Sequence, residues 1–161
     1  MLPLLGRLFP SVFGAKPPDD LFWITAELVQ SERFTSSAAP ALGRFAIGAV
    51  LDLRADERHD LASLGKAGLH YLHLATADDG TPTFEELSRA AGWAHQELGD
   101  DRKVLVHCRS AGGGLTVIGA LLLRIGYTMA DVMPLLQERS ASGLSDAQSA
   151  ALQRFADAAG R

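Results

Sequence analysis

Residues 104–116 read VLVHCRSAGGGLT. The apolar start is typical of a buried strand, and it places Cys108 at the carboxyl end, the edge where α/β sheets hold ligands. The glycines that follow permit backbone conformations that other residues resist. A helix is expected from about Leu115, so the N–H groups before it can form an anion-binding loop. Such a loop also lowers a cysteine pKa, which favours the nucleophilic thiolate. A tightly packed turn with a buried, inert cysteine explains these residues equally well.

Strands and helices alternate outward from this stretch, which predicts an α/β fold with a parallel-rich central sheet flanked by helices. The expected strands are 22–25, 49–53, 69–74 and 104–106. The expected helices are 61–67, 83–98, 115–125, 130–139 and 145–158. Residues 30–37 read as a polar connection.

The bulk composition narrows the function classes. A chain of 161 residues suits one domain. Its net charge of -4 argues against a nucleic-acid partner, which would require a basic face. No apolar run is long enough for an integral membrane segment. The single cysteine excludes an internal disulfide, and we expect a cytoplasmic protein.

Residues 1–20 form a candidate N-terminal arm in front of a domain at 21–161. Apolar residues recur in the arm at helical spacing, and it ends at a proline pair, Pro17-Pro18. It suits either a short interfacial helix or docking arm, or an arm packed on its own domain.

His107-Cys108, followed by a glycine-rich loop and an apolar helix, resembles the dual-specificity and tyrosine phosphatases, whose pattern is His-Cys-x-x-Gly-x-x-Arg-Ser/Thr. The resemblance implies that Cys108 attacks phosphorus and forms a phosphocysteine. It also implies that Asp79, with Asp78 as the alternative, protonates the leaving oxygen. The implied phosphate-binding loop comprises Arg109, Ser110, Ala111, Gly112, Gly113 and Gly114, with His107 and Thr116 in supporting roles.

The same resemblance implies that the substrate is a phosphorylated protein or a small phosphate ester, and it implies no cofactor. We also expect no metal site, because the five histidines lack a convincing ligand spacing. The oligomeric state is left open.

The chain departs from the family pattern at its arginine, which lies six residues after the cysteine. Gly114 stands there, and sliding the register by one residue brings Gly113 or Leu115. The arginine would grip two phosphoryl oxygens through its planar fork. Losing one preorganised donor costs about 10²–10³ in rate, so we expect weakened activity. Arg109 and Arg139 are the other candidate donors.

Two alternatives to a phosphatase remain. A non-catalytic relative would bind a phosphorylated partner without hydrolysing it. A rhodanese-like sulfurtransferase would carry a persulfide on its cysteine, and the runs Cys108-Arg109-Ser110 and Leu51-Asp52-Leu53-Arg54 resemble that family as well.

Overall fold

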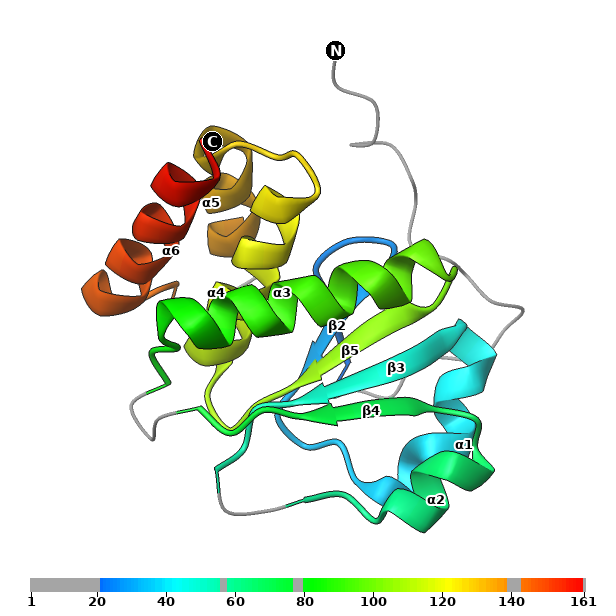
Figure 1. Ribbon diagram of the computed structural model, residues 1–161. Helices are drawn as coiled ribbons and strands as arrows, with labels where there is room; N and C mark the ends of the chain where they lie inside the picture. Colours follow the sequence, from blue (N-terminus) through cyan, green and yellow to red (C-terminus); the bar gives the residue numbers. More distant parts are fainter. Residues whose placement is uncertain (1–20, 56–57, 77–79, 139–142, 161) are drawn as a thin grey trace.

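A computed structural model describes residues 21–55, 58–76, 80–138 and 143–160. Its centre is a five-stranded sheet in the order β1-β2-β5-β3-β4 (Figure 1). The strands are β1 (Phe22–Trp23), β2 (Leu28–Ser31), β3 (Ile47–Asp52), β4 (His70–His73) and β5 (Lys103–His107). β1 pairs antiparallel with β2, and the other neighbours pair in parallel. The expected parallel-rich α/β sheet is therefore confirmed.

Strand β2 corrects the sequence interpretation, which placed a polar connection from residue 30. Gln30 and Ser31 continue the strand and are buried, because β2 pairs in parallel with β5 and Gln30 lies opposite Val106. The strand has four residues and two of them are polar, so its own composition carries almost no strand signal. Pairing with the neighbouring strand decides its structure.

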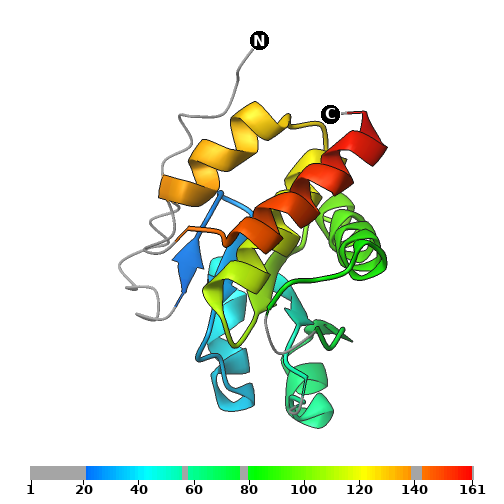
Figure 2. The ribbon, with the colours of Figure 1, turned by 90° about the vertical axis from the view of Figure 1, so that its left-hand side faces the viewer.

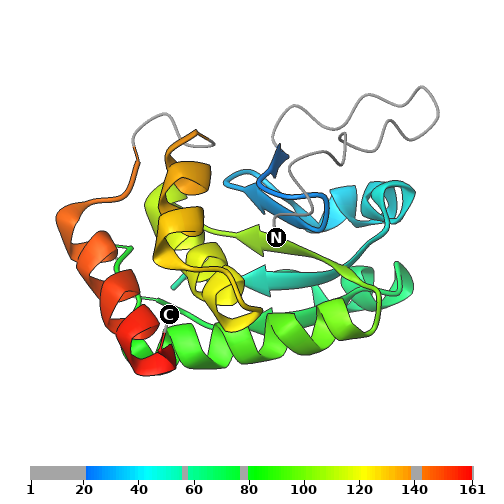
Figure 3. The ribbon, with the colours of Figure 1, turned by 90° about the horizontal axis from the view of Figure 1, so that it is seen from above.

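Helices cover both faces of the sheet. One face carries α3 (Phe84–Gly99), α4 (Ala111–Arg124), α5 (Met129–Glu138) and α6 (Asp146–Ala159). The opposite face carries α1 (Ala39–Leu42) and α2 (Leu61–Lys66), with 3-10 turns at Ser36–Ala38 and Gly43–Phe45. Seen from above, α3 runs along the sheet on one side (Figure 3).

Helix α4 is the central helix of the domain. Every residue from Gly113 to Leu123 is buried, and α5 and α6 flank the helix on its outer side (Figure 2). The burial explains the apolar sequence, because a helix that is apolar all round must be enclosed on all sides. None of the helices formed by the described residues is both long enough and apolar enough to cross a membrane.

Capping boxes begin two of these helices. Thr83 caps α3 and Glu86 completes the box, as the sequence predicts. Ser145 caps α6 and Gln148 completes its box. The proposed arm at residues 1–20 lies outside the described residues, so the domain boundary at residue 21 stays a prediction.

Candidate active site

Helix α4 begins at Ala111, only three residues after Cys108 and four residues earlier than expected. The glycines at 112–114 therefore lie in its first turn, and none of them has a positive φ. Their conformation is one that any residue adopts. The reason for glycine at these positions must lie in what packs against the helix.

Three different parts of the chain pack against the three glycines. A Cβ atom at Gly112 would meet the amide of Gln148, with Nε2 at 2.6 Å. At Gly113 it would lie 3.0 Å from the Gly80 carbonyl oxygen, and at Gly114 2.7 Å from the sulfur of Cys108. The run of glycines thus lets α6, the segment after residue 79 and the thiol approach the start of α4 together.

Cys108 is buried, with 2% of its surface exposed. Burial raises its pKa to about 11, against weaker lowering contributions that include hydrogen bonds from the Gln30 side chain and the Gly114 backbone. The expectation that the loop would lower this pKa is wrong for the structure described here. The helix N-terminus does provide a donor to the sulfur, but desolvation of the thiolate outweighs it.

Gln30 occupies the space next to Gly114 where the family's arginine would begin. Its Nε2 atom lies 3.2 Å from the position of a Cβ at Gly114. The same amide lies 3.4 Å from the Cys108 sulfur and donates a hydrogen bond of 2.9 Å to the Ala111 carbonyl. A neutral donor thus borders the thiol where the family pattern has a cation. Gln30 carries no signal in the sequence, because only the pairing of β2 with β5 brings it to the site.

The remaining predicted loop residues take different positions. Arg109 and Ser110 are exposed, and Ser110 caps α4 without a side-chain hydrogen bond. The Thr116 hydroxyl donates to the Gly112 carbonyl at 2.7 Å, which stabilises the first turn of α4. Arg139 lies outside the described residues.

Asp78 and Asp79 also lie outside the described residues, so their assignment as the acid stays a prediction. The next residue, Gly80, is described. Its carbonyl accepts a hydrogen bond of 2.9 Å from Gln148 Nε2, and it borders Gly113 in α4. Gln148, which completes the capping box of α6, thus ties α6 to this segment as well.

His107 belongs to a buried network beside the thiol. Its Nδ1 atom forms a hydrogen bond of 2.7 Å with His59 Nε2, and both rings stack with centroids 4.8 Å apart. Phe34 meets both imidazoles edge-on. Burial, followed by the charge of Arg54, lowers the pKa of His107 to about 4. The ring is therefore neutral near pH 7, and its hydrogen bond to His59 requires that one of the two nitrogens carry a proton and the other accept it.

Asp52, at the end of β3, completes this network. Arg54 donates to both of its carboxylate oxygens at 3.0 Å, and the Tyr71 hydroxyl donates at 2.8 Å. Burial raises the pKa of Asp52, but the hydrogen bonds from Arg54 and Tyr71 together bring it below the usual value. Burial, then the bond to Asp52, raises the pKa of Tyr71 to about 12. These contacts fix the carboxyl ends of β3, β4 and β5 relative to one another.

Asp52, His59 and His107 also form a candidate metal-ligand group, since one ligand atom of each lies within 4.8 Å of the others. The sequence offered no such spacing, because the three residues come from separate elements. The histidine nitrogens are only 2.7 Å apart and bond directly to each other. Arg54 already holds both carboxylate oxygens. This donor set fits a hydrogen-bond network better than a metal ion.

Solved structures share this fold. The phosphatase Tk-PTP in its active form is 21% identical, with a TM-score of 0.76, over 86% of this chain and 97% of its own. PTPMT1 in complex with PI(5)P is 16% identical, with a TM-score of 0.76, over 88% and 97% of the two chains. A variant of human DUSP28 is 18% identical, with a TM-score of 0.71, over 88% and 97%. No curated protein sequence is significantly similar to the chain.

A family comparison covers more than half of the sequence. Residues 30–127 match the family described as "Polymorphic toxin system, DSP-PTPase phosphatase". The matched region runs from Gln30 through Cys108 and the whole of α4, so it contains the described residues of the candidate site except Gln148. It favours the phosphatase hypothesis over the sulfurtransferase. The chain belongs to this family of dual-specificity and tyrosine-type phosphatases.

Proposed function

We propose that the protein hydrolyses a phosphate monoester through a phosphocysteine on Cys108, and that it does so slowly at neutral pH. The observation that carries the proposal is the position of the thiol, which lies against the first turn of α4 and receives a hydrogen bond from the Gly114 backbone. The N–H groups of a first helical turn have no partner within the helix, so they suit an anion. The phosphatase family match supports the same chemistry.

In the first proposed step, the Cys108 thiolate attacks phosphorus. A sulfur–phosphorus bond forms while the ester oxygen–phosphorus bond breaks, and Asp79 gives its proton to the leaving oxygen. In the second step, water attacks the phosphocysteine. An oxygen–phosphorus bond forms while the sulfur–phosphorus bond breaks, Asp79 takes a proton from the water, and inorganic phosphate and the Cys108 thiolate are released. The anchoring of Gly80, the neighbour of Asp79, at the start of α4 supports this assignment of the acid.

Two features support slow turnover. With a pKa of about 11, only about one thiol in 10⁴ is ionised at pH 7. Gln30 supplies an uncharged donor at the place of the family's guanidinium. A hydrogen bond from a guanidinium to a phosphoryl oxygen is about twice as strong as one from a neutral amide. A reducing compartment such as the cytoplasm would keep the single cysteine in its thiol form.

A second candidate function is binding of a phosphorylated partner without hydrolysis. The close packing around Gly114 favours it, because the thiol and Gln30 fill the space from which the family's arginine would act. Under this hypothesis the start of α4 would still bind phosphate through backbone N–H groups. Cys108 would then be a buried packing residue.

Hydrolysis of an aryl phosphate separates the two functions. We expect slow turnover by the wild type, none by Cys108→Ser, and a rate at least tenfold lower for Asp79→Ala. Asp157→Ala is the control, because that exposed carboxylate lies in α6 and contacts Gln153. No turnover from a folded wild type that still binds a phosphopeptide would favour the binding function. Turnover that survives Cys108→Ser would exclude the phosphocysteine.

A further inference from the structure

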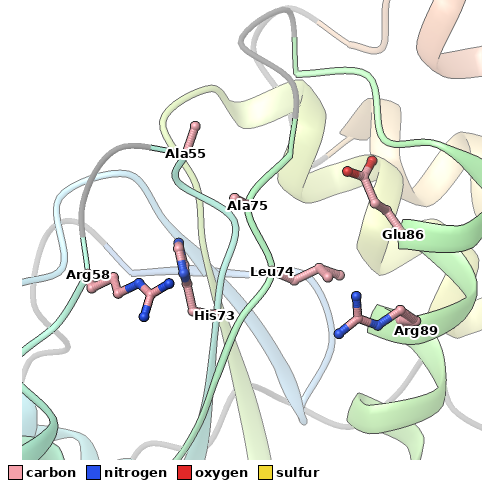
Figure 4. A pocket seen from close by; sticks show the side chains of 7 residues that line it. All are labelled: Ala55, Arg58, His73, Leu74, Ala75, Glu86 and Arg89. Carbon is pink, nitrogen blue, oxygen red and sulfur yellow. The ribbon is translucent and has the colours of Figure 1, made fainter.

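A hollow opens on the sheet edge that carries Cys108. Its cavity volume is about 540 Å³, within the range of small-molecule sites. It lies at the end of β4, between the segment before α2 and helix α3 (Figure 4). Four of its lining residues are ionisable: Arg58, His73, Glu86 and Arg89.

The charges in this hollow favour an anion. Arg58 and Arg89 approach from opposite walls and point toward each other, with His73 and Leu74 between them (Figure 4). Within the described segments, neither arginine forms an ion pair. The Glu86 carboxylate is engaged in the cap of α3, where it accepts from the Thr83 N–H at 2.7 Å. Two guanidinium groups thus face a polar hollow on a chain whose net charge is -4.

A phosphate group matches this lining. A phosphomonoester carries about −1.5 to −2 charges at neutral pH. Arg58 and Arg89 supply two positive charges, and the Glu86 carboxylate, which keeps its charge in the helix cap, leaves these three side chains with a net charge of +1. Each guanidinium presents its donors in a planar fork that fits two phosphoryl oxygens. His73 is held in place, because its Nε2–H donates to the Arg54 carbonyl at 2.6 Å.

The strand order gives the separation between the hollow and the thiol. Cys108 follows β5, His73 ends β4, and β3 lies between these two strands. Neighbouring strands are about 4.8 Å apart, so the two sites are roughly 10 Å apart along the same edge. One small molecule can therefore reach both sites.

We propose that the hollow between Arg58 and Arg89 binds a second phosphate group of a small substrate whose first phosphate is presented to Cys108. The substrate class is then a small molecule with two phosphate groups about 10 Å apart. The link to Cys108 rests on the proposed phosphatase function. Binding of phosphate in the hollow does not depend on turnover, so the two can be tested separately.

Titration with inorganic phosphate tests the hollow directly, with the arginine side-chain N–H signals followed by NMR. We expect the Arg58 and Arg89 signals to shift with one common saturation curve. Arg58→Ala or Arg89→Ala should weaken this binding about ten- to hundredfold, the loss of a charged hydrogen-bond partner. The control is Arg44→Ala, an exposed arginine beside α1. Unmoved Arg58 and Arg89 signals, or an equal loss in the control, would overturn the proposal.

Kinetics then test the link to the thiol. Hexanediol bisphosphate should have a kcat/KM at least tenfold above that of hexyl phosphate, and Arg58→Ala or Arg89→Ala should abolish this advantage through KM. Arg44→Ala, the control outside the hollow, should leave the kcat/KM of both esters unchanged. Equal values for the two esters in the wild type, or an advantage only for a doubly phosphorylated peptide, would overturn the substrate class. If no ester is hydrolysed, the phosphatase proposal fails. The phosphate titration still tests whether the hollow binds phosphate.

Discussion

At the scale of single residues, Cys108 is subject to opposing effects. The start of α4 and the Gln30 amide both stabilise its thiolate, while burial among the core side chains destabilises it more strongly. The result is a nucleophile in the right place but in the wrong protonation state at pH 7. Its chemistry should therefore depend on pH far more steeply than that of a thiol with a neighbouring cation.

The first prediction concerns the titration of Cys108. The initial rate of its alkylation by iodoacetamide should rise about tenfold per pH unit above pH 7 and level off only near the pKa of about 11. Because the chain has one cysteine, mass spectrometry of the intact protein reports this site alone. Cys108→Ser is the control for labelling of other residues. A rate that has already levelled off by pH 8 would contradict the burial argument.

The second prediction concerns the donor beside the thiol. Gln30→Leu removes the amide that lies 3.4 Å from the sulfur. A hydrogen bond to a charged group contributes about 1.5–3 kcal/mol, so alkylation at pH 9 should become about ten- to hundredfold slower. Gln137→Leu is the matched control, since Gln137 is an exposed glutamine on α5. An unchanged rate in Gln30→Leu would show that the Gln30 amide does not stabilise the Cys108 thiolate.

At the scale of elements, the start of α4 is a junction of four segments. Strand β2 brings Gln30, β5 brings Cys108, and α6 brings Gln148. Gly80 reaches the same turn from the segment before α3. The glycines serve this close approach rather than an unusual backbone conformation, since their φ angles are negative.

The third prediction separates these two roles of glycine. Gly113→Ala should lower the free energy of unfolding by about 1–3 kcal/mol, because its Cβ would lie 3.0 Å from the Gly80 carbonyl oxygen, which Gln148 holds. Gly65→Ala in α2 has no atom within 4 Å and should stabilise by about 0.5–1 kcal/mol. Urea denaturation of both variants measures this. Stabilisation by Gly113→Ala would mean that the junction is loosely packed.

Elements with local signals could be predicted from the sequence, and elements that depend on distant partners could not. The capping box at Thr83 and the apolar pattern of α3 identify that helix within a few residues. Helix α4 starts earlier than its sequence predicts, because three glycines in a row disfavour a helix unless other segments pack against them. Strand β2 was missed for the same kind of reason, since its pairing partner lies more than 70 residues away.

At the scale of the whole molecule, a buried polar network joins the carboxyl ends of three strands. His107, His59 and Asp52 are each at most 6% exposed. Tyr71 and Arg54 complete the hydrogen bonds of Asp52. Such a network stabilises the fold only while His107 stays neutral, because a protonated ring would place a buried positive charge beside Arg54.

The fourth prediction is the pH dependence of stability. The pKa of His107 is about 4 in the folded protein and near 6.5 in the unfolded chain, so between these values only the unfolded state binds the proton. The contribution of neutral His107 to the free energy of unfolding is complete above about pH 6.5. As the pH falls toward 4, the free energy of unfolding decreases by about 3 kcal/mol. Denaturant unfolding across this range measures the loss.

A second readout follows the protonation of His107 itself. The ring protons of His107, followed by NMR in the wild type, should not titrate until the pH is near 4. Exposed His95 provides the comparison within the same spectra. A midpoint for His107 near 6.5, or a stability that does not change between pH 6.5 and 4, would contradict the neutral network.

Some residues of the candidate site could be predicted from the sequence and others could not, as with the elements of the fold. The motif around Cys108 could be recognised because its residues are consecutive. Gln30, His59 and Asp52 could not, because they come from β2, the segment before α2, and the end of β3. Nothing in their local sequence distinguishes them from ordinary polar positions. Only the shared carboxyl edge of the sheet brings Gln30 to within 3.4 Å of the thiol, and His59 and Asp52 to within 4.0 Å of His107.

The most direct test of the central claim is to trap the phosphocysteine. The wild type would be mixed with an aryl phosphate at pH 9, where more thiolate is present, then denatured at that pH and analysed by mass spectrometry. The account predicts one phosphoryl group on the peptide that contains Cys108, absent in Cys108→Ser, and a greater yield in Asp79→Ala if loss of the acid–base group slows breakdown more than formation. Released phosphate without any phosphoryl group on Cys108 at any quench time would contradict it.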